Sequence, residues 1–378
     1  MNFLHQYINP NIEPLFFGVY LITLSIQLYF IIIIQRKLAF LKLPKKNGQI
    51  RVPVSIIIAA RNESDKLFRN LPKILTQKYD VFEVIVVNHQ SIDNSKDILE
   101  AFSKQNEHLK IVELAEDKHL RTGKKLPLTI GVKAAKYEHL IFTDADCTPN
   151  SDRWIEKISA KFHGGKEIVL GYGPMLQSAG LLNKLIRFDT AWIGINYLSM
   201  ALNNQPYMGV GRNLAYTKSA FFSVDGFKSH YSISSGDDDL FIQEAVKKNG
   251  YTIEISPDTF MYSPAKKTMN DWFKQKSRHY QTTHRYPFIK KLLLAIYPIS
   301  LVLTWICFVS LVQVAFQELY LTISMLILYA LKWWIGARCL IKLEEKKLAL
   351  YFPFWDLFYA IFVPLLFLIA KNKKSTTW

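Results

Sequence analysis

Two aspartates one residue apart, Asp144 and Asp146, follow a short apolar run in the segment HLIFTDADC. Carboxylate oxygens suit Mg²⁺ or Mn²⁺, and such ions can bridge the phosphates of a substrate. The spacing is common, and a turn in which both side chains cap backbone N–H groups is the structural alternative. Because the pair stands at the tip of an apolar run, we favour a metal site.

A second acidic group is the run Asp237-Asp238-Asp239 in SSGDDDL. Three successive carboxylates repel one another, so we expect at least one to have a raised pKa. Such a carboxylate beside a diphosphate site can serve as a general base. The structural alternative is an acidic helix N-terminus. Both can hold, because residues 240–247 have a helical pattern.

Basic residues form two further groups. Residues 272–280, WFKQKSRHY, combine cations with aromatic rings, which suits a clamp on a leaving diphosphate or an interfacial helix that anchors a domain. The loop with Arg121, Lys124 and Lys125 has the same two interpretations. Polar loops at 61–63 and 88–93 can bind a base and a ribose, although ordinary loop chemistry is the better explanation of these residues taken alone.

The elements that must position these residues alternate between two patterns. Apolar β-branched runs predict strands at 54–60, 82–88, 109–114 and 139–143, and amphipathic segments predict helices at 63–77, 95–105 and 126–136. This alternation predicts an α/β domain with a parallel sheet and helices on its faces. Ligands of such sheets lie at the carboxyl ends of the strands, where several of the polar groups fall.

The two ends of the 378-residue chain are strongly apolar. Uncharged runs at 15–35 and 292–316 are long enough to cross a bilayer as helices, and a third run at 319–337 contains Lys332, which can snorkel or face a helix partner. The stretch at 350–370 carries Asp356 and Pro364, and we leave open whether it crosses or re-enters.

Charge placement predicts the orientation of the chain. No Lys or Arg precedes the first apolar run, and five basic residues follow it: Arg36, Lys37, Lys42, Lys45 and Lys46. By the positive-inside rule, residues 1–14 lie outside and the domain at 50–285 is cytoplasmic, on the inner membrane of the cell. Lysines after 370 would then break the rule if the last stretch crosses.

Composition excludes several classes of protein. Half of the residues are hydrophobic, which excludes a disordered chain, and three cysteines are too few for a disulfide scaffold. The net charge of +16 suggests an anionic partner. Because the cations flank the apolar runs and no nucleic-acid motif is present, we expect contact with membrane lipids and no binding to nucleic acid.

Six motifs in order resemble the membrane-bound family 2 glycosyltransferases, a family that includes cellulose, hyaluronan and poly-N-acetylglucosamine synthases and ceramide glucosyltransferases. The motifs are VSIIIAARNE, GKKLPLTIGV, FTDADC, GVGRNLAYTKSAFFSVDGF, SGDDDL and QKSRH. The resemblance implies a GT-A fold, with a Rossmann-like mixed sheet flanked by helices, on residues 50–285. One amino-terminal and two to three carboxy-terminal transmembrane helices complete the expected architecture.

The resemblance also implies roles for single residues. Asp146 would bind a divalent Mg or Mn ion, with Asp144 near the metal and the ribose, and Asp238 would be the general base, with Asp237 and Asp239 as alternatives. Gln275, Arg278 and His279 would contact the nucleotide diphosphate or the glycan. The nucleotide pocket would be lined by Arg61, Glu63, Asn88, Asp93 and Lys124.

The resemblance implies an inverting transfer of a sugar from a nucleotide-diphosphate donor, expected to be a UDP-sugar, to a hydroxyl of a lipid-linked or exported glycan. Two positions depart from the family: His89 replaces an aspartate that helps hold the base, and His279 replaces the tryptophan of QxxRW. The alternatives are a processive synthase that translocates its product and a catalytically silent membrane scaffold.

Overall fold

The computed structural model describes residues 13–43, 51–114, 123–233, 235–312 and 318–371. The expected outer segment at 1–12, Lys45, Lys46, Arg121 and the lysines after 371 lie outside these ranges. The chain forms two compact units: an α/β unit from residues 42–285 and a helical unit from residues 1–41 and 286–372.

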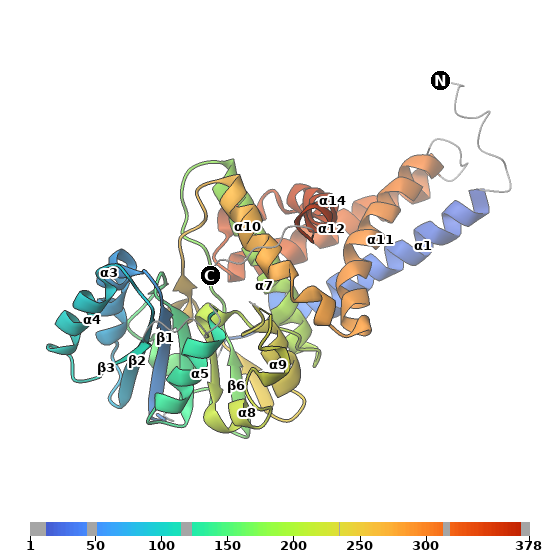
Figure 1. Ribbon diagram of the computed structural model, residues 1–378. Coiled ribbons are helices and arrows are strands. Elements are labelled where there is room, and N and C mark those ends of the chain that lie inside the picture. The colour runs from blue at the N-terminus through green and yellow to red at the C-terminus, as the bar shows by residue number, and fades with distance from the viewer. Residues whose placement is uncertain (1–12, 44–50, 115–122, 234, 313–317, 372–378) are drawn as a thin grey trace. The chain divides into compact units, whose positions relative to one another are not determined.

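The first half of the α/β unit follows the predicted alternation closely (Figure 1). Its strands are β1 (Val54–Ala60), β2 (Phe82–His89), β3 (Leu109–Leu114) and β4 (His139–Asp144). Its helices are α3 (Ser64–Leu75), α4 (Ser95–Ser103) and α5 (Lys125–Ala134). The strands pair in parallel, with β1 between β2 and β4, so the predicted parallel arrangement is confirmed for this half.

The second half turns the sheet into a mixed one. Strand β7 (Leu214–Thr217) pairs antiparallel with β4 and with β6 (Lys166–Leu170), and β6 pairs in parallel with β8 (Gly250–Ile253). The seven strands have the order β3-β2-β1-β4-β7-β6-β8. A short two-stranded sheet joins β5 (Thr148–Pro149) to β9 (Met261–Tyr262).

Alternate residues of the central strands enter two hydrophobic cores, one on each face of the sheet. In β1, Ile56 and Ile58 join the core shared with α3, and Ile57 and Ala59 join the core shared with α5. A Cβ on Gly131 of α5 would lie 2.5 Å from the Ile57 side chain, so the close approach of α5 to β1 requires glycine. Burial on both faces explains the uninterrupted apolar sequence of β1.

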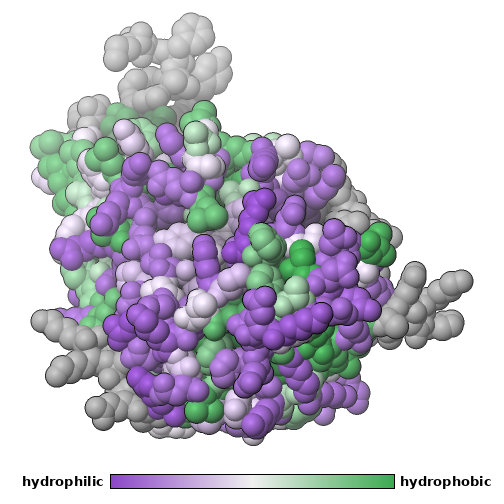
Figure 2. Space-filling model, turned by 90° about the vertical axis from the view of Figure 1, so that its left-hand side faces the viewer, coloured by the Kyte–Doolittle hydropathy of each residue, from purple (hydrophilic) through white to green (hydrophobic). Residues whose placement is uncertain are grey.

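The remaining elements of the α/β unit cover its second half. The longer helices are α6 (Trp154–Ser159), α7 (Leu181–Leu202), α8 (Lys218–Phe222), α9 (Asp239–Ala245) and α10 (Met269–Tyr280). Short 3₁₀ turns lie at η2 (Gly211–Asn213), η3 (Lys228–His230), η4 (Pro257–Thr259) and η5 (Thr283–Arg285). Figure 2 shows one face of the molecule as mostly hydrophilic, with scattered hydrophobic residues.

The helical unit contains four helices that are long and apolar enough to cross a membrane, at 13–39, 288–312, 319–342 and 352–369. They comprise α1 (Glu13–Tyr29) with a π-helical turn η1 (Phe30–Gln35) and α2 (Arg36–Ala39), then α11 (Phe288–Val312), α12 (Glu318–Lys342) and α14 (Phe352–Lys371). A short helix, α13 (Lys346–Ala349), precedes α14. The expected one amino-terminal and up to three carboxy-terminal helices are therefore confirmed.

A buried polar network joins these helices and explains Lys332. Its ammonium pairs with Asp356 of α14 at 2.6 Å and donates to Gln27 of α1 at 2.8 Å. Tyr297 of α11 donates to Asp356 at 3.0 Å, and Gln27 donates to the Tyr297 carbonyl at 2.9 Å. Lys332 thus faces a helix partner, the second of its two alternatives. Each of the four helices contributes at least one polar side chain to the network.

Candidate active site

The parallel register brings the carboxyl ends of β1, β2 and β4, with the polar residues that follow them, to the same end of the sheet. In the register of the parallel strands, Ala60 of β1 is paired with Asn88 of β2, and Ala59 is paired with Asp144 of β4. The loops that follow these residues carry the predicted nucleotide-binding and metal-binding side chains. The topology therefore places these groups where parallel sheets bind ligands.

Asp144 and Asp146 lie with Cys147 in a group whose ligand atoms are all within 4.8 Å of one another. The Cys147 thiol donates to Asp146 at 3.3 Å, and burial raises its pKa well above the usual value, so it stays protonated. The two carboxylates are therefore the available donors. Oxygen donors of this kind fit Mg²⁺ or Mn²⁺.

Lys124 connects the metal candidate to the acidic run. Its ammonium forms an ion pair with Asp144 and lies 3.7 Å from a carboxylate oxygen of Asp237. Burial alone would lower the pKa of Lys124, but the two carboxylates outweigh it and raise the pKa, so this side chain is cationic. One lysine thus brings together two motifs that are far apart in the sequence.

The same cation acts on Asp144. Burial opposes ionisation of this carboxyl, but Lys124, Arg212 and Arg278 outweigh burial and lower its pKa. The Asp144 side chain is 34% exposed, so burial raises its pKa less than it would in a fully enclosed site. Asp144 is therefore an anion in a cationic setting that also suits a diphosphate.

The three aspartates of the acidic run have different surroundings. Asp238 caps helix α9: one of its oxygens accepts from the Asp239 backbone N–H at 2.8 Å, and the other accepts from the Gly211 N–H at 3.1 Å. Burial, with help from Asp237 and Asp239, raises the pKa of Asp238 to about 7. A carboxylate that titrates near neutral pH is well matched to general-base work.

Asp239 is held by two other groups. Its carboxylate accepts from the Thr282 hydroxyl at 2.5 Å and from the Leu240 backbone N–H at 2.8 Å, and the residue is 7% exposed. Asp237 faces Lys124 instead. The helix-capping alternative is therefore correct for Asp238 in geometry, and it leaves the proposed catalytic role open, because an N-cap oxygen can also accept a proton.

Gly211 lies at the centre of this arrangement. A Cβ built at this position would lie 3.4 Å from Asp237, 3.5 Å from the Lys124 ammonium and 3.6 Å from Asp238. The space beside Gly211 is therefore enclosed by two carboxylates and one cation. The next residue, Arg212, donates to the Gly173 carbonyl and adds to the positive charge near Asp144.

The loops after β1 and β2 hold each other in place. Asp93 accepts from the Ser64 N–H at 3.0 Å and from both the N–H and the hydroxyl of Ser95. Burial would raise its pKa, but these hydrogen bonds prevail and lower it. Asn62 adopts a left-handed conformation and accepts from the Ile92 N–H at 2.8 Å. Asp93 therefore has a structural role in the loop, whatever it contributes to a nucleotide.

The other predicted nucleotide-side residues cluster nearby. Asn88 is buried and donates to Glu113 at 3.0 Å, and Glu63 pairs with Lys66. Burial raises the pKa of Glu63, and the nearby Asp146 and Asp144 charges add to this rise. His89 is fully buried, and burial and the charge of Arg61 lower its pKa. A neutral imidazole therefore occupies position 89, where the resemblance drawn from the motifs leads us to expect an aspartate.

Helix α10 carries Gln275, Arg278 and His279 at helical spacing of three and four residues. The helix is fixed on its buried side by Lys276, which pairs with Asp189 of α7 at 2.5 Å, both side chains being 5% exposed. At its end, Thr282 bonds to Asp239. The charge of Arg278 acts on Asp144, whereas His279 lies exposed.

Several residues of the site carried no sequence signal of their own. Gly211 and Arg212 lie inside the quoted GVGRN segment, so that motif pointed to the right loop without distinguishing single residues. Lys276 lies inside QKSRH, and that motif does not distinguish it from its neighbours. Asp189 and Thr282 lie outside every motif, and only the tertiary contacts identify them.

Comparison with known families identifies the class of protein. The model of glycosyl transferase family 2 matches residues 55–221, and that of glycosyl transferase family group 2 matches residues 141–337, more than half of the chain. The chain belongs to the family 2 glycosyltransferases, and the resemblance drawn from its motifs is confirmed.

The chain is similar to poly-beta-1,6-N-acetyl-D-glucosamine synthases of Staphylococcus aureus (strain MSSA476) and Staphylococcus epidermidis. Each is 26% identical over 273 residues, which cover 72% of this chain and 64% of the relative. The chain thus spans less than two thirds of the length of these relatives.

A solved structure supports the fold. The mannosyltransferase PcManGT from Pyrobaculum calidifontis, in complex with GDP-Man and Mn²⁺, has a TM-score of 0.57 and 14% identity, with 93% of this chain and 99% of that chain covered. The expected GT-A architecture is confirmed.

Proposed function

We propose that the protein is a metal-dependent, inverting glycosyltransferase that moves a sugar from a nucleotide-diphosphate donor to a hydroxyl of a lipid-linked or exported glycan. The observation that carries this proposal is the ion-paired position of Lys124 between Asp144 and Asp237. It joins a carboxylate pair suited to a metal and a diphosphate with a carboxylate run suited to proton transfer.

The proposed chemistry assigns a step to each group. Asp146 and Asp144 would hold Mg²⁺ or Mn²⁺, which neutralises the charge of a leaving diphosphate. Lys124 and Arg278 add positive charge at the same place. Asp238 accepts the proton of the acceptor hydroxyl while its oxygen attacks the anomeric carbon. The bond to the diphosphate breaks on the opposite face, so the configuration inverts.

Donor and acceptor are proposed from the relatives. The names of the staphylococcal synthases point to N-acetylglucosamine, and a UDP-sugar is our expected donor. GDP-Man is bound in the PcManGT structure, so it belongs in the same screen. The neutral His89 beside Arg61 is the feature that we expect to distinguish the bases.

The orientation is part of the proposal. Residues 50–285 form the catalytic domain on the cytoplasmic side of the cell membrane, where nucleotide-sugars are made, with the amino terminus outside. Support comes from Arg36 and Lys37, which lie in α2 at the end of the first membrane-length helix. Reporter fusions after Lys46 and after Lys291 should both be active only in the cytoplasm, and activity on the far side contradicts this orientation.

A processive synthase is the second candidate, because the relatives are named as synthases of a polymer. Four candidate spans among the described residues are few for a channel, so an oligomer or a partner would have to complete one. His279 at the tryptophan position of QxxRW favours single transfer instead. A silent scaffold is disfavoured because the carboxylate pair, the acidic run and Arg278 are all present.

The test is a donor screen on detergent-purified protein with a lipid extract as acceptor. Release of nucleotide is measured for UDP- and GDP-sugars, with Mn²⁺, with Mg²⁺ and with a chelator. Metal-dependent release and a radiolabelled lipid or polymer product support the proposal, and product length separates single transfer from polymerisation. Binding of nucleotide-sugars without turnover under every condition supports the scaffold.

A further inference from the structure

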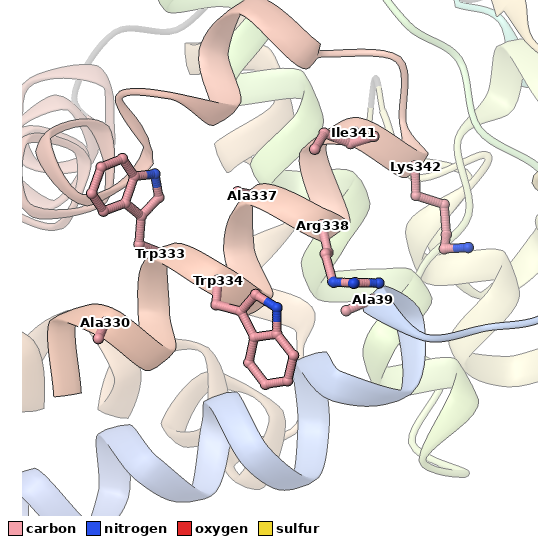
Figure 3. A pocket seen from close by; sticks show the side chains of 8 residues that line it. All are labelled: Ala39, Ala330, Trp333, Trp334, Ala337, Arg338, Ile341 and Lys342. Carbon is pink, nitrogen blue, oxygen red and sulfur yellow. The ribbon is translucent and has the colours of Figure 1, made fainter. Parts of the chain in front are cut away.

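A groove of about 700 Å³ lies in the helical unit, and none of its lining residues belongs to the α/β unit that carries the proposed reaction. Figure 3 shows the side chains that line it. Its floor is one face of α12, and Ala39 of α2 lies opposite. The lining residues on α12 recur every three or four positions: Ala330, Trp333, Trp334, Ala337, Arg338, Ile341 and Lys342.

The polarity of the groove changes along helix α12. Its apolar end holds Ala330 and Trp333, and both of its cations, Arg338 and Lys342, lie at the other end. At a rise of 1.5 Å per residue, the distance along the helix from Ala330 to Lys342 is about 18 Å. That length accommodates a charged headgroup and the upper part of an acyl chain.

The cations are held in place by contacts that leave their charge uncompensated. The Arg338 guanidinium lies 4.7 Å from the ring centre of Phe40 and 5.7 Å from that of Trp334. The Lys342 ammonium donates to the Leu41 carbonyl at 2.7 Å. Among the described residues, no ion pair to a carboxylate involves either cation, and the groove lining contains no acidic residue.

The two tryptophans remain accessible: Trp333 is 47% exposed and Trp334 is 52% exposed. Indole rings of this kind are typical of the level at which headgroups meet acyl chains. Basic pockets beside transmembrane helices on the side that carries the positive charges bind anionic headgroups. The charge, the aromatic rings and the apolar end thus match one amphiphilic ligand.

We propose that this groove is a binding site for an anionic phospholipid, with the headgroup phosphate on Arg338 and Lys342 and the acyl chain along Trp333 and Ala330. The site does not depend on the proposed transferase reaction. It differs from a general attraction of basic residues to the membrane, because only the two lining cations contribute.

The test uses the full chain reconstituted with dibrominated lipids, which quench tryptophan fluorescence on contact. The chain has eight tryptophans, so the signal of the groove is the difference between the native protein and its W333F/W334F variant. Dibrominated phosphatidylglycerol is compared with dibrominated phosphatidylcholine. We expect the anionic lipid to quench the groove tryptophans at a lower mole fraction.

Substitutions separate a built site from diffuse charge. Arg338→Gln and Lys342→Gln should each reduce the preference for the anionic lipid about five-fold. The matched controls are Lys346→Gln and Lys347→Gln, which remove the same charge from exposed positions on α13 outside the groove. These controls should keep the preference, and thermal unfolding should show that all variants remain folded.

Two results overturn the proposal. One is equal quenching by the two lipids in the native protein. The other is an equal loss of preference in the control variants, which assigns the effect to the surface charge of the unit. Added inorganic phosphate should leave the quenching unchanged, and displacement of the lipid by free phosphate assigns the site to a soluble anion instead.

Discussion

Replacing Asp238 with asparagine should abolish most of the turnover and leave the fold intact. Asparagine has the same shape and keeps an oxygen that can cap helix α9 for the Asp239 N–H. It cannot accept a proton, and its amide N–H₂ cannot accept from the Gly211 N–H. The loss of one hydrogen bond to an ionised carboxylate is worth about 1.5 to 3 kcal/mol.

The kinetic effect should be much larger. Positioned proton transfer contributes roughly 10²- to 10⁴-fold to a rate, or about 3 to 5 kcal/mol in the barrier. Donor binding should change little, because the acceptor hydroxyl and not the donor gives up the proton. Turnover with the identified donor and binding of that donor by calorimetry check the two statements separately.

The pKa of Asp238 adds a dependence on pH. A base must be ionised to work, so kcat/KM of the native enzyme should rise with pH up to about 7 and level off above that value. Because folding raises this pKa from 3.8, ionised Asp238 destabilises the native protein as pH rises from about 4 to about 7. The melting temperature of D238N relative to the native protein should therefore increase over that range.

The neighbouring aspartates are the internal controls. Asp239→Asn and Thr282→Val disturb the hydrogen bond that ties α10 to α9, so both should lower the melting temperature more than they lower turnover. Asp237→Asn weakens the pairing with Lys124 and should raise KM for the donor. If Asp239→Asn or Asp237→Asn reduces turnover as much as D238N, with donor binding intact, the choice of Asp238 as the base is wrong.

Three further perturbations follow from the structure. Asp146→Asn should remove metal-stimulated nucleotide release with no change in melting temperature, and metal-stimulated turnover at the native level refutes the ligand assignment. Lys332→Met should lower the free energy of unfolding in detergent by about 3 to 5 kcal/mol, because it leaves buried Asp356 without its charge partner. The double variant Lys332→Met/Asp356→Leu should recover most of this loss. Unfolding followed by circular dichroism measures both effects. Lys276→Met leaves Asp189 without its buried partner and should lower the melting temperature and raise KM for the donor, and a variant with native KM would show that α10 does not need this ion pair.

Local pattern was sufficient for the first half of the α/β unit. The strand Val54–Ala60 has the predicted bounds. A strand that is buried on both faces has an uninterrupted apolar sequence, so the residues that interrupt this sequence on either side mark where it begins and ends. The second half has shorter strands of four or five residues, β6, β7 and β8, whose pairing partners are distant in sequence. The antiparallel placement of β7 between β4 and β6 has no local signal.

In the candidate site, too, some residues can be identified from local sequence and others only from tertiary contacts. Asp144 and Asp146 stand out because a strand points them at the ligand edge. The difference between Asp238 and Asp239 depends on Gly211 and Thr282, which lie on other elements, so no local pattern can show it.

Lys332 shows the limit of reasoning from single segments. In isolation, a lysine inside an apolar run argues against a membrane helix, because desolvation of one charge is expensive. The partner that reverses this inference, Asp356, lies in the last apolar run, for which the sequence leaves open whether it crosses or re-enters the membrane. The two charges that are costly in a membrane when each stands alone form one buried ion pair. A pairwise search for opposite charges among apolar runs can therefore identify helices that pack together, which neither run indicates alone.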